Sequence, residues 1–412
     1  MTRPGSMTPP RGHGIGRIGV IGLVLVGVIG LDAQAASAQS AGDAWRFDLG
    51  ATLQSLTSWV DPALESSDDD VQGVHGGVVR LKWSVEWTDR AVLEVHERVL
   101  ASVSASGALG PAGFGVSRRP GRAFDASATW VDTEGTRVVH DFDRIALRLF
   151  TGPVDWTIGR QAISWGTSVL FPVADLWAAF SPFELDVEER PGVDGIRALA
   201  YPGGVEVDGV LVDRGEDGVS GGVRGSWSGA RWEVWGGGGR FWDRTVGLAG
   251  VTWLGDHAQL RLEGAVGDAT RATLGVDRVS TRVSVSAEIH YNGDGAGSAA
   301  EYPAQLVSPV LSRGETYYLG RYYGGAAVVA SPDDEGRLSL ALSVLANLDD
   351  RSTAWTPSAS YDLGRSARVG VGGLLSTGDR PSLSGGDPSV PILPTEFGAY
   401  GRQVFVRISL FY

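Results

Sequence analysis

Apolar and polar residues alternate along most of the chain from residue 44 to the C-terminus. Between Val79 and Trp87, for example, every second residue is apolar, and the residues between them are charged or polar. Segments of about ten residues repeat this pattern, and turn sequences such as Pro-Gly and Pro-Asp-Asp-Glu-Gly separate them. A period of two predicts β-strands with one apolar and one polar face.

The number of strands indicates which β-fold the pattern fits. A first count gives seventeen, whereas a single-chain bacterial barrel has an even number. A weak strand at 271–277, with Leu274 and Val276 on one face, brings the number to eighteen, and sixteen stays open as an alternative. The predicted strands span 44–54, 75–87, 90–101, 138–150, 153–161, 193–200, 204–213, 218–228, 231–241, 245–254, 257–267, 271–277, 279–291, 316–331, 337–348, 354–363, 366–377 and 397–412.

Long connections alternate with short turns between these strands. The long ones are 55–74, 102–137, 162–192, 292–315 and 378–395. Outer-membrane barrels have the same asymmetry, with long outer loops and short periplasmic turns. Aromatic residues near strand ends, such as Trp232 and Trp253, fit an interfacial girdle. We therefore predict an all-β fold, a transmembrane antiparallel up-and-down β-barrel of about eighteen strands, rather than a soluble β-sandwich.

The first residues have the composition of a secretory signal. Three arginines form a positive region, Ile18–Leu31 is apolar, and Ala36-Ser37-Ala38 matches an A-x-A cleavage site. The apolar region is shorter than the roughly 20 residues of a membrane helix. We predict a cleaved signal peptide at 1–38 and an outer-membrane barrel at 39–412.

The C-terminal strand carries a second targeting feature. Val404, Val406, Ile408, Leu410 and Tyr412 share one face, and the chain ends in Phe411-Tyr412. This segment resembles the closing strand of bacterial outer-membrane barrels, whose terminal aromatic residue, most often Phe, is read by the barrel-assembly machinery; the terminal Tyr departs mildly from that pattern. The resemblance implies that machinery as a partner, contact with outer-membrane lipids, and a location in the outer membrane of a Gram-negative bacterium.

Composition excludes several other classes of protein. The chain has no cysteine, so disulfide frameworks, zinc fingers of the cysteine type and lipoprotein anchors are excluded. The net charge of −13, about −15 after signal cleavage, argues against nucleic acid as a partner. The five histidines after the signal are scattered, and no metal-ligand set or nucleophile motif accompanies them. We therefore predict neither an enzyme nor a cofactor or metal site.

Basic residues are frequent on the predicted inward faces. Rings of Arg and Lys favour anions in channels, so these residues predict anion preference. The alternative is that they pair with carboxylates of an inserted loop and hold it, and both interpretations stay open. The predicted pore-lining basic residues are Arg80, Lys82, Arg144, Arg148, Arg261, Arg282 and Arg407.

The segment Ile158–Arg197 follows neither a strand nor a helix period, yet it is rich in apolar and acidic residues. Irregular backbone at membrane depth must be buried in protein or face water. We therefore expect its central part, the third outer loop, to fold into the barrel, with apolar residues packed inside and acids facing the basic wall. The predicted constriction residues are Arg160, Trp165, Asp175, Asp186, Glu188, Glu189, Arg190 and Asp194.

The same segment carries a motif, GRQ-x-I-S-W-G, then F-P-x-x-D-L-W and S-P-F-x-L-D-x-E-E-R-P-G-V-D-G-x-R. It resembles a segment of poorly characterised outer-membrane porin-like barrels, similar in style to alginate-export porins. Leu170-Phe171 stands where the family pattern has a polar Asn before Pro-x-Asp. The resemblance implies an outer-membrane channel and does not name its substrate.

We predict a porin-like channel through which small hydrophilic solutes, with anions favoured, diffuse across the outer membrane. One alternative is a barrel plugged by the third loop, with a structural or attachment role. Another is an outer-membrane barrel hydrolase, which would need a His beside a Ser or Asp on adjacent strands. A monomer and a homotrimer both stay open.

Overall fold

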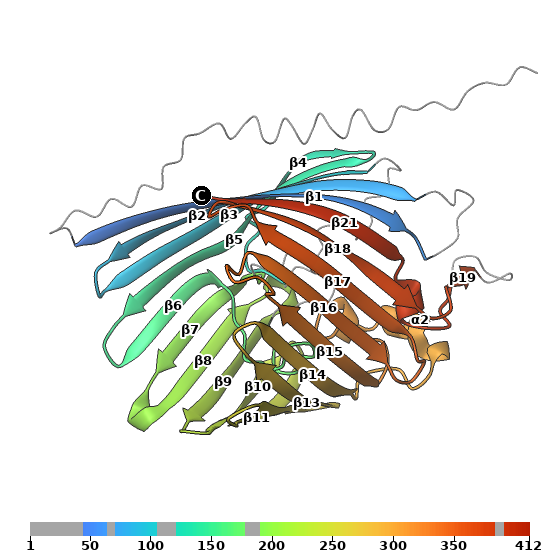
Figure 1. The fold of residues 1–412 in the computed structure, drawn as a ribbon. Coiled ribbons are helices and arrows are strands. Elements are labelled where there is room, and N and C mark those ends of the chain that lie inside the picture. Colours follow the sequence, from blue (N-terminus) through green and yellow to red (C-terminus); the bar gives the residue numbers. More distant parts are fainter. Residues whose placement is uncertain (1–43, 64–70, 105–120, 178–189, 384–390) are drawn as a thin grey trace, which may run out of the picture.

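The computed structural model describes residues 44–63, 71–104, 121–177, 190–383 and 391–412. Within them, one antiparallel sheet closes into a barrel of eighteen strands (Figure 1). These strands are β1 (Trp45–Asp61), β2 (Gln72–Trp87), β3 (Ala91–Ser104), β5 (Thr136–Phe150), β6 (Val154–Gln161), β7 (Val193–Ala200), β8 (Val205–Asp213), β9 (Val219–Ser228), β10 (Trp232–Phe241), β11 (Arg244–Leu254), β12 (Gln259–Val266), β13 (Thr270–Val279), β14 (Val283–Asn292), β15 (Tyr322–Ala330), β16 (Leu338–Asn347), β17 (Thr353–Asp362), β18 (Ala367–Thr377) and β21 (Arg402–Phe411).

Each barrel strand pairs with its neighbours in sequence, and β21 closes the barrel against β1. In that last pairing Thr52 lies opposite Phe411, and Asp61 lies opposite Arg402. The predicted eighteen-stranded barrel is confirmed, and the weak strand predicted at 271–277 is β13. The predicted signal peptide at 1–38 lies outside the described residues.

The two faces of the wall differ in polarity. In β12, Leu260 and Leu262 are 45% and 48% exposed, whereas Arg261 and Glu263 are 3% and 1% exposed. Apolar side chains therefore point outward and charged side chains inward, the reverse of a soluble protein. This arrangement excludes the soluble β-sandwich and confirms the predicted transmembrane barrel.

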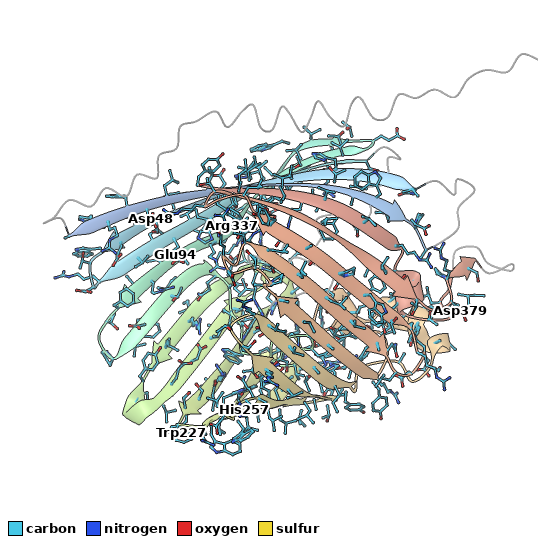
Figure 2. All side chains as sticks on the ribbon, viewed as in Figure 1. Asp48, Glu94, Trp227, His257, Arg337 and Asp379 are labelled. Carbon is cyan, nitrogen blue, oxygen red and sulfur yellow. The ribbon has the colours of Figure 1, made fainter. Side chains whose placement is uncertain are left out.

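The long connections lie at one end of the barrel, together with a few short ones, and the connections at the other end are all short turns. Asp48 in β1 and Asp379 in the β18–β21 connection mark the two ends (Figure 2). The connection between β14 and β15 contains η3 (Ala299–Glu301), α2 (Tyr302–Leu306) and α3 (Pro309–Ser312). The β18–β21 connection contains β19 (Ser382–Leu383), β20 (Pro391–Ile392) and η4 (Phe397–Ala399). No helix among the described residues is long and apolar enough to cross a membrane.

Some predicted boundaries are wrong. β1 continues to Asp61 and β2 begins at Gln72, so the first outer loop is shorter than 55–74. β4 (Ala128–Thr133), a short strand that pairs with β5, lies within the predicted loop 102–137. β15 begins at Tyr322 instead of 316, because the preceding residues pack in the outer loops. Two 3-10 turns, η1 (Pro202–Gly204) and η2 (Gly215–Asp217), join neighbouring strands.

Candidate functional site

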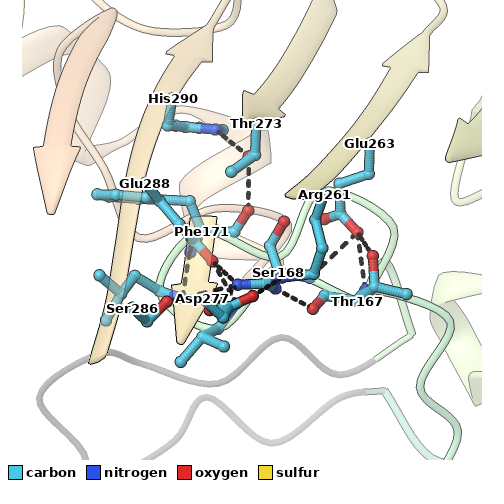
Figure 3. A network of polar contacts seen from close by, with 12 residues as sticks. Thr167, Ser168, Phe171, Arg261, Glu263, Thr273, Asp277, Ser286, Glu288 and His290 are labelled. Atoms are coloured by element: carbon cyan, nitrogen blue, oxygen red, sulfur yellow. Dashed lines mark hydrogen bonds and ion pairs between the residues drawn. The ribbon is translucent and has the colours of Figure 1, made fainter. Parts of the chain in front are cut away.

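The first half of the third outer loop, residues 162–177, contacts the inward side chains of the wall (Figure 3). Glu288 of β14 accepts hydrogen bonds from the backbone amides of Val169, Leu170 and Phe171, at 2.7, 3.0 and 3.0 Å. Glu288 is 3% exposed, so its charge is withdrawn from water and directed at these donors. One wall carboxylate thus fixes three consecutive residues of irregular backbone.

A second carboxylate, Glu263 of β12, holds the loop on either side of that contact. It accepts hydrogen bonds from the amide and hydroxyl of Thr167, at 2.7 and 3.0 Å, and from the amide of Ser168 at 3.3 Å. Its other oxygen accepts from the amide of Val173 at 2.5 Å. Buried backbone amides need acceptors, and the wall supplies them where the loop has no secondary structure.

Arg261 compensates the charge of Glu288 and of a further carboxylate, Asp277. Its guanidinium lies 2.9 Å from Glu288 and makes two hydrogen bonds to Asp277 of β13, at 2.5 and 2.7 Å. It also donates to the backbone carbonyl of Thr167. Arg261 was predicted to line the pore, and the structure places it in the contact between wall and loop.

Thr273 of β13 makes a further contact with the loop backbone. Its hydroxyl donates to the carbonyl of Phe171 at 2.8 Å and lies 2.9 Å from Nδ1 of His290. The Phe171 ring stacks on the His290 ring, with centroids 5.1 Å apart and an interplanar angle of 3°. The loop is therefore held by ring packing as well as by hydrogen bonds.

Apolar residues of the loop pack in two clusters against different parts of the wall. Trp165 and Trp177 join Phe241 of β10 in the first cluster, and the indole N–H of Trp165 donates to Asp208 of β8 at 2.8 Å. Phe171 belongs to the second cluster, which includes residues of β15, β16 and β17. The described half of the loop thus reaches from the β8–β12 side of the barrel to the β15–β17 side.

Asp175 does not face the basic wall as the sequence led us to expect. Its carboxylate accepts hydrogen bonds within the loop, from the hydroxyl of Ser164 at 2.8 Å and the amides of Trp165 and Gly166 at 2.9 and 2.8 Å. Its second oxygen accepts from Arg190. Asp175 is 1% exposed, so this carboxylate shapes the loop from within.

Arg160 and Asp194 join the two ends of the loop. They lie opposite each other in the β6–β7 register, and the guanidinium makes two hydrogen bonds to the carboxylate, at 2.7 and 2.9 Å. Arg160 also donates to the carbonyls of Phe142 and Phe124, and Asp194 accepts from the amide of Ala123. Both residues were predicted in the constriction, and the structure places them on β6 and β7, the strands that the loop connects, where they pair.

The remaining predicted loop acids, Asp186, Glu188 and Glu189, lie outside the described residues. The prediction that they face the wall stays a prediction, as does the path of the second half of the loop.

The other predicted basic residues occupy different environments. Arg80 is buried and lies 3.3 Å from Asp143 of β5. Arg148 lies 3.9 Å from Glu94, and its side chain is 46% exposed. Lys82 lies on β2 and Arg407 on β21, and each alternates with outward apolar residues. Arg144 lies on β5, next to an irregularity in the β3–β5 register.

Arg282 differs from the prediction, because β14 begins at Val283, whereas the predicted strand began at residue 279. Arg282 lies in the turn after β13 and bonds to Asp334 of the β15–β16 turn at 2.5 Å, with both side chains largely exposed. It therefore lies at the short-turn end of the barrel instead of along the wall.

A buried acid at the outer end ties three connections together. Glu396 accepts hydrogen bonds from the hydroxyl of Tyr323 at 2.5 Å, the side-chain amide of Asn347 at 2.7 Å and the amide of Leu319 at 3.0 Å. Burial raises the pKa of Glu396 to about 7, although these donors act in the opposite direction. No pattern in the sequence indicated a role for Glu396.

No protein-family model matches the chain, and no curated protein matches it in sequence. Solved structures resemble it in fold. OccAB4 of Acinetobacter baumannii superposes with a TM-score of 0.54 at 9% identity, over 89% of this chain and 98% of that chain. OccAB3 of the same organism gives a TM-score of 0.53 at 10% identity, over 89% and 99%. OccAB2 gives a TM-score of 0.53 at 10% identity, over 89% and 98%.

These likenesses concern the fold alone. The fold is that of porin-like outer-membrane channels, and the outward apolar surface requires a lipid environment. The predicted location in a Gram-negative outer membrane is therefore confirmed. The resemblance to alginate-export porins has no counterpart among these structures. What this barrel shares with these structures is the architecture of an outer-membrane porin.

Proposed function

We propose that this chain is an outer-membrane channel for the diffusion of small hydrophilic solutes, narrowed by its third outer loop. The observation that supports this most is the anchoring of residues 162–177 by inward carboxylates, Glu263 and Glu288, of a closed barrel. A loop fixed across the interior sets the width of whatever path remains beside it. A polar inner wall keeps such a path hydrated.

Anion preference is the finer part of the proposal. Arg261 contacts the loop and two carboxylates, so we assign it a holding role, as the alternative interpretation of the basic residues had it. Arg148 differs, because it is partly exposed and its nearest carboxylate, Glu94, lies at 3.9 Å. An exposed cation of this kind attracts anions to a narrow path. We therefore assign selectivity to Arg148 and to its neighbours on the inner wall.

The test is conductance of the purified protein in planar lipid bilayers. Discrete ion-conducting steps support a pore, and a bilayer that stays sealed at every protein concentration overturns it. Arg148→Glu should lower the anion-to-cation permeability ratio severalfold. Arg282→Glu is the matched control, since Arg282 lies in an exposed turn outside the wall. Equal anion-to-cation permeability ratios in the wild type and Arg148→Glu would refute the anion preference, and the proposal of a channel would stand.

A plugged barrel is the second candidate, and one observation favours it. The two apolar clusters bury Trp165, Trp177 and Phe171 almost completely, as a permanent plug would. The same bilayer experiment separates the candidates, because a plug gives no steps. Release of the loop by mutation would then produce steps that the wild type lacks.

A barrel hydrolase has weaker support. Histidines lie beside polar residues on adjacent strands, with Thr57 and His75 at 2.8 Å and Glu97 and His140 at 2.7 Å. Neither of these two pairs contains the Ser or Asp that the predicted hydrolase would need beside its His. The likeness to alginate-export porins and the homotrimer remain hypotheses, which solute-uptake assays and mass measurement in detergent would test.

A further inference from the structure

The outward face of β17, β18 and β21 carries an open groove of about 370 Å³. Its lining includes Pro357, Ala359, Val371, Gly373, Leu375 and Val404. Val371, Leu375 and Val404 are about half exposed and alternate with inward residues, so the groove faces the lipid. The groove lies toward the ends of these strands that join the long connections.

Small residues form the floor of the groove. The β17–β18 register passes from Trp355–Leu375 to Ser358–Gly372 without pairing Pro357, which has no amide hydrogen to donate. At Gly373 a Cβ atom would lie 2.7 Å from the backbone oxygen of Gln403, so a larger residue does not fit there. The shape of the groove is therefore built into the backbone of three strands.

Two guanidinium groups stand at the outer edge of this groove. Arg402 shares the outward face of β21 with Val404, about 7 Å farther along the strand. It is exposed, and no carboxylate of the described residues lies within ion-pair distance of it. Arg380 donates to Asp61 at 2.8 Å, and Asp61 lies opposite Arg402 in the β1–β21 register. Arg380 is thus paired with Asp61 and follows Asp379 in the chain, so Arg402 supplies the guanidinium that has no carboxylate partner among the described residues.

We propose that this groove and its arginine edge bind a phosphorylated, multiply acylated glycolipid of the outer leaflet, of the lipid A type. One acyl chain lies in the groove, and a phosphate accepts hydrogen bonds from Arg402 and Arg380. The groove matches a chain because its lining is apolar, and the arginines match phosphate because guanidinium binds it through paired donors. The site requires the outer-membrane location alone and does not depend on channel function.

Native mass spectrometry of the delipidated protein in detergent tests the proposal. The probes are bis-phosphorylated lipid A, phosphatidylglycerol and phosphatidylcholine, each titrated at equal concentration. We expect lipid A to be retained most strongly. Arg402→Gln should weaken retention about tenfold, because one charge-assisted contact is lost. Ala359→Phe should weaken it through the groove, with the arginines intact.

Two control variants keep the test specific. Arg282→Gln removes an exposed arginine at the opposite end of the barrel, and Ala287→Phe enlarges an outward residue of β14. Both should retain lipid A as the wild type does, and heat-modifiable migration on gels shows that every variant is folded. Equal retention of lipid A by the wild type, Arg402→Gln and Ala359→Phe would overturn the proposal. Retention of phosphatidylcholine equal to that of lipid A would also overturn the proposal, because it would mean that the protein holds lipids without regard to their headgroups.

Discussion

Replacing Glu288 by Ala removes one of the two wall carboxylates that anchor the third loop. Three amide hydrogen bonds, from residues 169–171, are lost with it. A hydrogen bond to a charged group contributes about 1.5–3 kcal/mol, and released amides regain water, so the lower value applies and the three bonds sum to about 4–5 kcal/mol. Burial of Phe171, at about 2 kcal/mol, still favours the bound state but is unchanged by the mutation.

A loss of about 4–5 kcal/mol changes the ratio of bound to released loop by about a thousandfold or more. Hydrogen exchange at the amides of residues 169–171 reports that ratio directly, because exchange requires the hydrogen bond to open. We expect exchange in Glu288→Ala to be at least about a hundredfold faster, since Glu263 and Arg261 still hold the neighbouring residues. Single-channel conductance should rise as the loop leaves its position.

Glu94→Ala is the control, because Glu94 is a wall carboxylate whose ion-pair partner is Arg148, not the loop. Its exchange at residues 169–171 should equal that of the wild type. Unchanged protection of these amides in Glu288→Ala would refute the reasoning, since it would mean that packing alone positions the loop. Faster exchange without any change in conductance would instead show that the loop is anchored as described but does not narrow the path.

Three further changes test other parts of the structure. Glu396 has a pKa raised to about 7 in the folded protein against 4.5 for a free glutamate, so its contribution to stability is present below pH 4.5 and falls by about 3 kcal/mol as pH rises to 7. Glu396→Gln should abolish that decline in thermal melting, and an identical decline in both proteins would contradict the assignment. Asp175→Ala should lower the free energy of unfolding by about 2–5 kcal/mol because buried amides lose their acceptor, whereas Asp175→Asn keeps an acceptor and loses mainly the contact with Arg190. Equal melting temperatures of the two variants would count against this. Gly159→Ala should prevent folding, since φ is +111° and a Cβ would lie 2.2 Å from a backbone oxygen of β5. Gly209→Ala, where a Cβ would make an ordinary contact of 3.9 Å with a backbone oxygen, should fold normally on heat-modifiable gels.

The barrel could be predicted from sequence because its wall has a simple physical rule. Each strand must present apolar residues to lipid and polar residues to the interior, and this forces a period of two. The requirement for an even number of strands then led to the prediction of the weak strand β13. The extension of β1 was missed because Ser55 and Thr57, although on the outward face with Trp59, are polar. β4 was missed because a six-residue strand within a long connection gives too little pattern.

The site was predicted less well, and the reason lies in the kind of contact that builds it. We expected acids of the loop to meet bases of the wall. In the described half, acids of the wall meet backbone amides of the loop, and Asp175 turns back into the loop. Every residue except proline carries a backbone amide, so no sequence pattern marks which ones a carboxylate will bind. Glu263 and Glu288 are visible in the sequence only as inward acids among inward arginines.

Anchoring through the backbone has a consequence for how the loop and wall divide their roles. Glu263 and Glu288 bind backbone amides, which every residue except proline would supply at those loop positions. Among the clamped residues, Val169 is 59% exposed, so its side chain is free to vary, whereas Phe171 and Val173 are buried. Since the wall carboxylates bind the backbone and the Val169 side chain is exposed, substitutions at Val169 can alter the chemistry of the path while the loop stays where it is. The wall carboxylates therefore set the position of the loop, and the exposed loop surface sets the chemistry of the path.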